Sequence, residues 1–201
     1  MLDTHARKFV QPLLDKVAGA FIKLGFSANG VTILAFVVGL GSAFLLVFAC
    51  PAVAIATLWL SGLLDAVDGT VARKTGTSSH LGTVMDIVFD RIVEIGILMA
   101  FVFINPGLAV HVAIVLCTII VSMTIFLTVG ASTSEAVRKK NTEKKSFYYQ
   151  VGLTERADGF VMLSIAMFLQ AHRGTVLLIF AAMILFTAVQ RFVEAVKLLK
   201  E

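Results

Sequence analysis

The stretch "LLDAVDGTVARKTGTSSHLGTVMDIVFDR", residues 63–91, places four aspartates within sequence that otherwise looks like membrane-spanning helix. Asp65 and Asp68 are three residues apart, and Asp86 and Asp90 are four apart. These spacings stack side chains on one face of a helix. A short polar segment separates the two pairs, so we expect two antiparallel neighbouring helices whose carboxylates converge. Ionisable residues inside a membrane are costly and are functional candidates by default.

The composition of the whole chain is that of a polytopic membrane protein. Of its 201 residues, 58% are hydrophobic and 15% are charged, and the mean hydropathy is +0.93. A soluble domain averages roughly 45–50% apolar and about 25% charged residues. The net charge of +4 fits basic residues at the cytoplasmic ends of spans, and no nucleic-acid partner is expected. Cys50 and Cys117 lie in apolar runs without metal-ligand spacing.

Six membrane spans are predicted behind an amphipathic N-terminal segment. Residues 1–26 alternate charged and apolar residues at helical spacing, with Phe9, Leu13, Val17 and Phe21 on one face. This pattern predicts a helix lying on the membrane surface. Each predicted span is near the ~20 residues that cross the hydrocarbon core. The spans are predicted near residues 30–49, 52–73, 81–104, 108–134, 154–171 and 175–198.

The loop charges predict the orientation of the chain. Nearly all lysines and arginines outside the spans lie in the N-terminal segment, the 73–80 loop, the 135–153 loop and the C-terminus, whereas the opposite side carries only Arg173. By the positive-inside rule, both termini and the aspartates face the cytoplasm. We therefore expect an all-α, multi-pass protein of the cytoplasmic (inner) membrane, with a juxtamembrane helix at 1–26 and a six-span membrane domain at 27–201.

The chemistry of the four carboxylates points to metal ions. They cannot all ionise together in a low dielectric without compensation. Hard divalent cations such as Mg²⁺, Mn²⁺ or Ca²⁺ prefer carboxylate oxygens, and two-metal sites recur where phosphoryl oxygens are displaced. Capping, or solvation by lipid headgroups, is the alternative for any single aspartate, but matched faces argue against it for all four. Gly69, Ala72 and Gly82 leave room for a ligand, and Arg73 could add a phosphate contact.

The same stretch resembles the signature of a known family, the CDP-alcohol phosphotransferases. In this chain the signature reads Asp65-x2-Asp68-Gly69-x2-Ala72-Arg73-x8-Gly82-x3-Asp86-x3-Asp90. The resemblance implies a juxtamembrane helix, a six-span catalytic domain and a homodimer. It also implies transfer of a substituted phosphoryl group from a CDP-linked donor, CDP-diacylglycerol in phospholipid synthesis, to an alcohol with release of CMP.

The resemblance also implies roles for single residues. Asp65, Asp68 and Asp86 would ligate two ions of Mg²⁺ or Mn²⁺, and Asp90 would be the general base and could also touch a metal. The cytidine and pyrophosphate pocket would include Asp65, Asp68, Gly69, Ala72, Arg73 and Gly82. The segment "SANGVT", residues 27–32, sits where many members carry Pro-Asn-x-x-Thr. For Asn29 and Thr32, a place near the donor phosphates and a simple helix cap both remain open.

Basic residues of the later half are candidates for the acceptor site. Loop lysines are by default solvated near anionic lipid, whereas Arg156 and Arg191 are costlier to place and are better candidates for contacts with an anion. The candidate acceptor residues are Arg138, Lys145, Arg156 and Arg191. Glu94, one turn deeper than Asp90, could tune the metals, but pairing with Arg91 is favoured.

The expected activity is therefore transfer of a phosphatidyl group to a small polar alcohol. Glycerol 3-phosphate is the first choice because it is small and anionic, and the alternatives are inositol phosphate, inositol, serine and phosphatidylglycerol. A different class, a divalent-cation transporter, also places acids inside membranes. Against it, the acids gather at one membrane face only.

Overall fold

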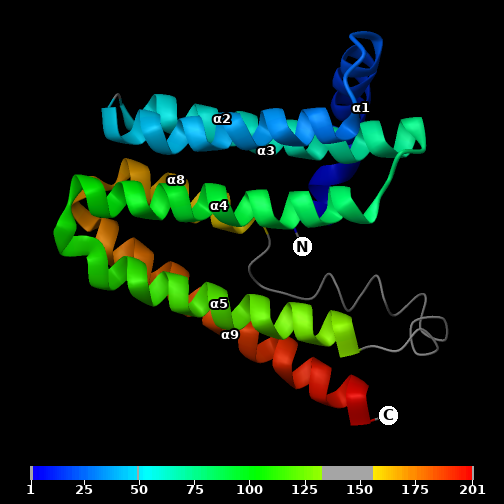
Figure 1. Ribbon diagram of the computed structural model, residues 1–201. Coiled ribbons are helices and arrows are strands. Elements are labelled where there is room, and N and C mark those ends of the chain that lie inside the picture. Colours follow the sequence, from blue (N-terminus) through cyan, green and yellow to red (C-terminus); the bar gives the residue numbers. More distant parts are fainter. Residues whose placement is uncertain (1, 49, 133–155, 201) are drawn as a thin grey trace. The chain divides into compact units, whose positions relative to one another are not determined.

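A computed structural model describes residues 2–48, 50–132 and 156–200, which contain helices and turns and no strand (Figure 1). The helices fall into two compact units, Leu2–Leu108 and Ala109–Glu201, each described here by itself. The first unit holds α1 (Leu2–Lys23), α2 (Ala28–Phe48), α3 (Pro51–Thr75), α4 (His80–Ile104) and the 3-10 turn η1 (Pro106–Leu108). The second holds α5 (Ala109–Ser132), α8 (Arg156–Phe168), the 3-10 turn η2 (Gln170–His172) and α9 (Arg173–Lys200).

Four stretches of helix are long and apolar enough to cross a membrane, and they match the predicted spans one, two, four and six. They are Ala28–Phe48, Pro51–Thr75, Pro106–Gly130 and Gln170–Lys197. The 25-residue helix α4 stays outside this group because Asp86, Asp90, Arg91 and Glu94 interrupt its apolar sequence. Helix α8 has 13 described residues. The count of six spans therefore remains a prediction.

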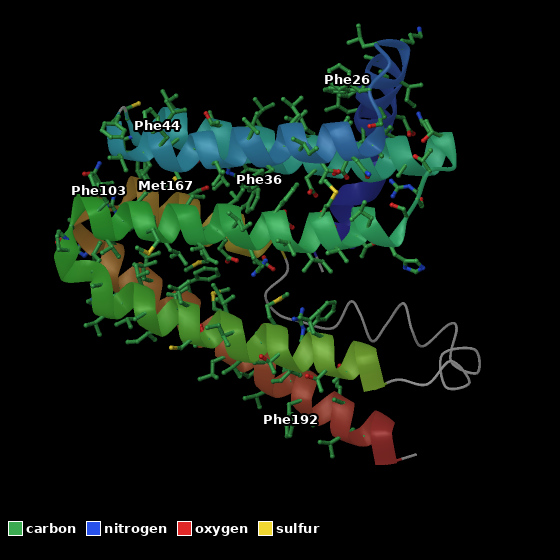
Figure 2. The ribbon with its side chains drawn as sticks, in the orientation of Figure 1. Phe26, Phe36, Phe44, Phe103, Met167 and Phe192 are labelled. Atoms are coloured by element: carbon green, nitrogen blue, oxygen red, sulfur yellow. The ribbon has the colours of Figure 1, made fainter. Side chains whose placement is uncertain are left out.

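Large apolar side chains cover the outside of the helices. Phe44 of α2, Phe103 of α4 and Phe192 of α9 are each more than half exposed, and all three are labelled in Figure 2. In water each such side chain would forgo roughly 1.5–3 kcal/mol of burial free energy. In the hydrocarbon of a bilayer that cost disappears, so the pattern is the one expected of helices that face lipid.

Helix α1 ends at a glycine, and its geometry explains the predicted break. Gly25 has φ +81°, its N–H donates to the carbonyl of Ile22, and the N–H of Phe26 donates to the carbonyl of Phe21. These two bonds form a Schellman motif, in which glycine is preferred because its φ is positive. The rings of Phe21 and Phe26 also meet edge to face at 5.3 Å, which supplies the apolar contact of that motif.

The face that α1 buries overlaps only in part with the predicted one: Val17 and Phe21 of that face pack against the core, but two residues outside it form the centre. Leu14 and Ala18 are 4% and 0% exposed and belong to a core that includes Val67 and Val71 of α3, whereas Leu13 is 54% exposed. One residue rotates a side chain by about 100° around a helix, so the choice between adjacent leucines decides the face. Helix α1 thus packs on the C-terminal part of α3, near the link to α4 (Figure 1). Its position on a membrane surface stays a prediction.

Helix α2 is the helix on which α3 and α4 both pack. Two buried serine hydroxyls link α2 and α3: Ser42 Oγ donates to the carbonyl of Ala54 and Ser61 Oγ to that of Ala35, each at 2.8 Å. On the other side, the rings of Phe36 and Phe89 stack with centroids 4.3 Å apart. Helix α4 therefore takes its position mainly from α2.

In the second unit, α9 packs against both α5 and α8. Its core is made of large apolar side chains, among them Met167, Leu177 and Phe180, which are 0–1% exposed. Arg173, the cation expected on the side opposite the aspartates, is the first residue of α9. Its side chain is buried, and Nε donates to the carbonyl of Ala166 at 2.9 Å.

Candidate active site

The site is built on the α3–α4 hairpin, whose turn is fixed at both ends. Gly76 adopts the left-handed conformation at φ 67°, where its N–H donates to the carbonyl of Ala72 and ends α3. Ser79 then caps α4 by accepting a hydrogen bond from the N–H of Gly82 at 3.0 Å. The chain reverses across residues 76–79 (Figure 1), so the two aspartate pairs end up on facing helices.

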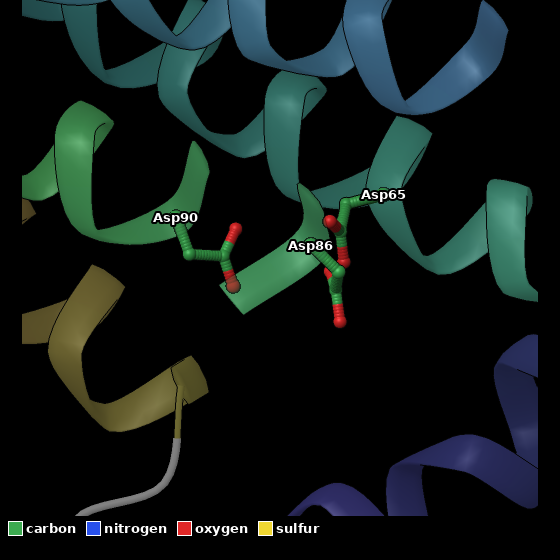
Figure 3. A group of neighbouring side chains, drawn as sticks. All are labelled: Asp65, Asp86 and Asp90. Carbon is green, nitrogen blue, oxygen red and sulfur yellow. The ribbon is translucent and has the colours of Figure 1, made fainter. Parts of the chain in front are cut away.

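Three of the four aspartates meet. One carboxylate oxygen each of Asp65, Asp86 and Asp90 lies within 4.8 Å of the others, and all three side chains are half-buried. Figure 3 shows the carboxylates of Asp65 on α3 and Asp86 on α4 lying together, with Asp90 one turn along α4 turned toward the same space. Oxygens this close repel one another unless a cation or protons compensate. An all-carboxylate donor set fits hard ions such as Mg²⁺ or Mn²⁺.

Asp68 is not part of this group of three. It is 8% exposed, and together with Asp86 it lines an adjoining cavity of about 190 Å³. Asp86 is therefore the residue shared by the acid cluster and the cavity. The four signature acids divide into a cluster and a cavity wall, whereas the spacing suggested a single convergent group.

The cavity is lined mainly by residues with polar side chains, which come from α2, α3, the turn and α4. Its lining residues are Ala28, Asn29, Thr32, Asp68, Gly69, Ala72, Arg73, Thr77, Ser78, Ser79, Gly82, Thr83 and Asp86. Every residue predicted for the donor pocket except Asp65 is among them. Its volume is below the about 300 Å³ at which drug-sized ligand pockets begin, so it suits the phosphate end of a donor better than a whole nucleotide.

Four hydroxyl residues of this lining were missed by the sequence reasoning. Thr77, Ser78, Ser79 and Thr83 belong to the run "TGTSSHLGT", most of which the sequence predicts only as a polar loop. The available signal was the density of hydroxyls immediately before the start of a helix, where backbone N–H groups and hydroxyls together can accommodate an anion.

Arg73 is held over the cavity wall by its neighbours. Its Nη2 donates to Oγ1 of Thr70 at 2.9 Å, and Thr70 is buried. A Cβ atom added at Gly69 would lie 3.4 Å from Arg73 Nη1, so the guanidinium lies against the bare backbone of that glycine. Gly69 and Thr70 thus position the guanidinium group of Arg73.

Asn29 and Thr32 line the cavity, and the helix cap belongs to another residue. The N–H of Gly30 donates to Ser27 Oγ at 3.1 Å, which makes Ser27 the cap of α2. Thr32 Oγ1 donates to the carbonyl of Ala28 at 3.1 Å. Asn29 Oδ1 would be 3.4 Å from a Cβ atom placed at Gly82, so α2 and α4 approach each other at this point.

Two ion pairs flank the site. Arg91 Nη1 lies 2.6 Å from Glu94 Oε2, which confirms the expected pairing of Glu94. Lys74 Nζ lies 3.0 Å from Asp15 Oδ1 and donates to the carbonyl of Asp15 at 3.0 Å. The hydrogen bond from Lys74 to the side-chain carboxylate is the main cause that holds the pKa of Asp15 below its usual value. The pair ties α1 to α3 one residue beyond Arg73.

The candidate acceptor residues are only partly described. Arg138 and Lys145 lie outside the described residues, as does the side chain of Arg156, the first residue of α8. Arg191 is described: its guanidinium carbon stands 5.6 Å from the centroid of the Phe126 ring on α5. This cation–π contact stabilises a charge within the apolar second unit.

Known proteins match this chain over most of its length. The family model of CDP-alcohol phosphatidyltransferase matches residues 26–190. An archaetidylinositol phosphate synthase of Pyrococcus horikoshii is 27% identical over 200 residues, covering 100% of this chain and 99% of that protein. The inner membrane protein YnjF of Escherichia coli K12 is 27% identical over 195 residues, covering 95% and 93% respectively. Together with four apolar helices, these matches identify a multi-pass membrane protein.

A solved structure shares the fold. The phosphatidylinositol phosphate synthase of Mycobacterium tuberculosis with CDP-DAG bound superposes with a TM-score of 0.72 at 21% identity, covering 92% of this chain and 94% of that one. The same synthase in complex with manganese and citrate gives a TM-score of 0.70 at 19% identity, covering 90% and 88%.

Proposed function

Because the chain belongs to the CDP-alcohol phosphatidyltransferase family, we propose that it transfers a phosphatidyl group from CDP-diacylglycerol to a phosphorylated polar alcohol and releases CMP. One observation carries the proposal: a three-carboxylate cluster shares Asp86 with a polar cavity lined by Arg73 and hydroxyl groups. Metal-binding and phosphate-binding chemistry thus adjoin in one place, as transfer of a phosphoryl group between two oxygens requires.

The residues divide the chemical work. Asp65 and Asp86 of the cluster, with Asp68 of the adjoining cavity wall, would hold divalent cations, and such ions would supply the positive charge that stabilises a leaving CMP. Arg73 and the cavity hydroxyls orient the phosphate oxygens. Asp90 accepts the proton of the acceptor hydroxyl as its oxygen attacks the lipid-linked phosphorus. The bond from that phosphorus to CMP then breaks, and CMP leaves with the electron pair.

The acceptor is an inositol phosphate. Glycerol 3-phosphate is the first choice from the sequence alone, but the matched relatives include the archaetidylinositol phosphate synthase of P. horikoshii and a phosphatidylinositol phosphate synthase of Corynebacterium glutamicum, 35% identical over 95 residues. Arg191, a candidate acceptor residue from the sequence, stays a candidate contact for the phosphate of such an acceptor.

The membrane arrangement follows from the same proposal. Six spans, with α4 and α8 crossing as well, place both termini and the acid cluster at the cytoplasmic face. The acyl tails of the donor then stay in lipid while its cytidine enters from water. The protein works as a homodimer, as the family resemblance implies.

Purified protein in mixed micelles tests the proposal. CDP-diacylglycerol and Mn²⁺ or Mg²⁺ are supplied with one acceptor at a time: inositol phosphate, glycerol 3-phosphate, inositol, serine or phosphatidylglycerol. We expect CMP and a phosphatidylinositol phosphate product, lost on chelation with EDTA and restored by excess Mn²⁺. The Asp65→Asn variant is the negative control.

Two results would redirect the proposal. No CMP with any acceptor would end the transferase function, and in that case Mn²⁺ uptake into proteoliposomes would distinguish a cation transporter. CMP with glycerol 3-phosphate alone would keep the function and change the acceptor.

A further inference from the structure

Gly39 of α2 lies where α2 closely approaches both α3 and α4. A Cβ atom added at Gly39 would lie 2.6 Å from Cγ2 and 2.9 Å from Cγ1 of Val93 on α4, and 2.8 Å from Ser61 Oγ on α3. Ordinary van der Waals contact begins at 3.4 Å. The absence of a side chain at this one position therefore permits two helix contacts at once.

These two contacts lie one turn away from the acid cluster. Ser61 precedes Asp65 by four residues on α3, and Val93 follows Asp90 by three residues on α4. Residues three or four apart share a helix face and are separated by about 4.5–6 Å along the axis. A displacement of either helix at Gly39 is therefore passed to a metal-ligating carboxylate one turn along a rigid rod.

The residues around Gly39 are closely packed, so they can move little to accommodate an added Cβ atom. Ser61 is buried, and its hydroxyl donates to the carbonyl of Ala35 at 2.8 Å, so a Cβ at Gly39 would press on a hydroxyl that is already engaged. Val93 is buried too. Because α3 and α4 each pack on α2, the separation between their acids depends on how closely each sits against α2.

We propose that Gly39 is a positioning residue for the metal site: its missing side chain sets the spacing of α3 and α4 that brings Asp65, Asp86 and Asp90 together. The inference rests on the proposed function, since it assumes that the cluster binds a divalent cation. Relieving the contact at Val93 from 2.6 Å to 3.4 Å needs a movement several times larger than the about ±0.2 Å tolerated in metal–ligand distances.

Mn²⁺ binding to the purified, full-length protein, measured by electron paramagnetic resonance, tests the inference without using activity. We expect Gly39→Ala to weaken Mn²⁺ binding about 10-fold or more, the loss typical when the support of metal ligands is disturbed. Two matched glycines serve as controls. A Cβ at Gly96 would meet Leu40 Cδ2 at 3.4 Å, and a Cβ at Gly41 would meet nothing within 4 Å, so their alanine variants should bind like the wild type.

A rescue separates positioning from general damage. Val93→Ala with Ser61→Ala removes all three atoms that the new methyl group would strike. Adding Gly39→Ala to that background should change Mn²⁺ affinity by about twofold or less, because the substitutions then no longer conflict. Turnover of Gly39→Ala should also recover at saturating Mn²⁺, which damage to the fold alone would not produce.

The outcomes are distinct. If Gly39→Ala binds Mn²⁺ like the wild type, or weakens binding equally in the rescue background, the positioning role is wrong while the proposed function stands. If Gly39→Ala does not fold, the rescue background decides by the same criterion. If the wild type binds no Mn²⁺, the metal-dependent function fails, and the positioning role fails with it.

Discussion

The two units of the chain hold their helices together in different ways. In the first unit, Leu2–Leu108, serine hydroxyls on one helix donate to backbone carbonyls of another, and Gly39 lets three helices meet. In the second unit, Arg173 makes one comparable bond, from Nε to the carbonyl of Ala166, but Thr118, Thr124 and Thr128 donate within their own helix α5, and large apolar side chains fill the core. Hydrogen bonds and close backbone approach fix distances between helices, whereas apolar packing tolerates small shifts. The first unit thus holds its helices at closely defined separations.

The largest expected effect comes from removing an acid of the cluster in the first unit. Asp65→Asn and Asp86→Asn should each lower metal-dependent turnover to an undetectable level. A lost ligand should cost more than the about 10–100-fold that accompanies loss of its support. CMP release and Mn²⁺ affinity are the measurements. Asp15→Asn, which removes an acid outside the cluster, is the matched control, and near-normal turnover in either cluster variant would rule out the metal assignment.

The next largest effect separates the two roles within the cluster. Asp90→Asn should lower kcat by about 10²–10⁴-fold, the usual contribution of a general base, while CDP-diacylglycerol still binds. Single-turnover kinetics and equilibrium binding of the donor measure the two quantities. Unchanged kcat would remove Asp90 as the base, and equal loss of donor binding would make it chiefly a metal ligand.

A smaller effect is expected from a substitution in the second unit. It tests whether Arg191 contributes to acceptor binding. Arg191→Gln should raise KM for inositol phosphate about 10-fold, equivalent to about 1.4 kcal/mol, and leave KM for the donor unchanged. Phe126→Leu keeps the guanidinium and removes only the ring on which it rests, so it should lower stability by about 0.5–1 kcal/mol with little change in KM. An equal rise for uncharged inositol would contradict an anion contact.

A further test in the first unit asks whether Thr70 holds Arg73 in position. Thr70→Val keeps the shape of the side chain and removes the hydroxyl that accepts from Arg73. A hydrogen bond contributes about 1 kcal/mol, so KM for CDP-diacylglycerol should rise about fivefold with kcat nearly unchanged. Thr57→Val, on the same helix and outside the cavity lining, removes a hydroxyl that donates only to the carbonyl of Val53 and is the control. If both variants behave alike, Thr70 does not position Arg73.

The smallest effect concerns the tie between α1 and α3. Lys74 lowers the pKa of Asp15 below its usual 3.8, so the native state binds that proton less readily than the unfolded state. The stabilisation that this pair contributes to the native state is fully present at pH values above the usual pKa of Asp15. It is lost as the pH falls through the lowered pKa that Asp15 has in the native state. Because both side chains are substantially exposed, the contribution is small. The difference in thermal unfolding midpoint between wild type and Asp15→Asn should shrink on acidification; a difference that grows would contradict the pairing.

Much of the candidate site could be predicted because its geometry is local. The spacing from Asp65 to Asp90 contains two helix faces and one turn, and glycine and serine at positions 76 and 79 mark where the helices end and begin. The departure of Asp68 from the cluster was not predictable, since it depends on how α3 rotates against α2. A single residue step turns a side chain by about 100°.

Other misses have equally specific causes. Leu13 and Leu14 are adjacent and both apolar, so periodicity alone could not choose which of them packs on α3. Helix α4 falls outside the apolar candidates because the acids of the site lie in its sequence. The density of hydroxyl residues at 77–79 was a signal in the sequence, but their place in the site depends on the cavity whose other side is formed by α2.

The turn at residues 76–79 has a consequence for how the protein is made. All three clustered acids belong to one helical hairpin, and α2, the helix on which it packs, precedes it in the chain. A nascent chain can therefore assemble the acid cluster before α5, α8 and α9 leave the ribosome, because closing a short local loop costs little entropy. A divalent ion taken up at that stage would stabilise the partly synthesised protein by mass action, so such an ion would assist biogenesis before it assists any reaction.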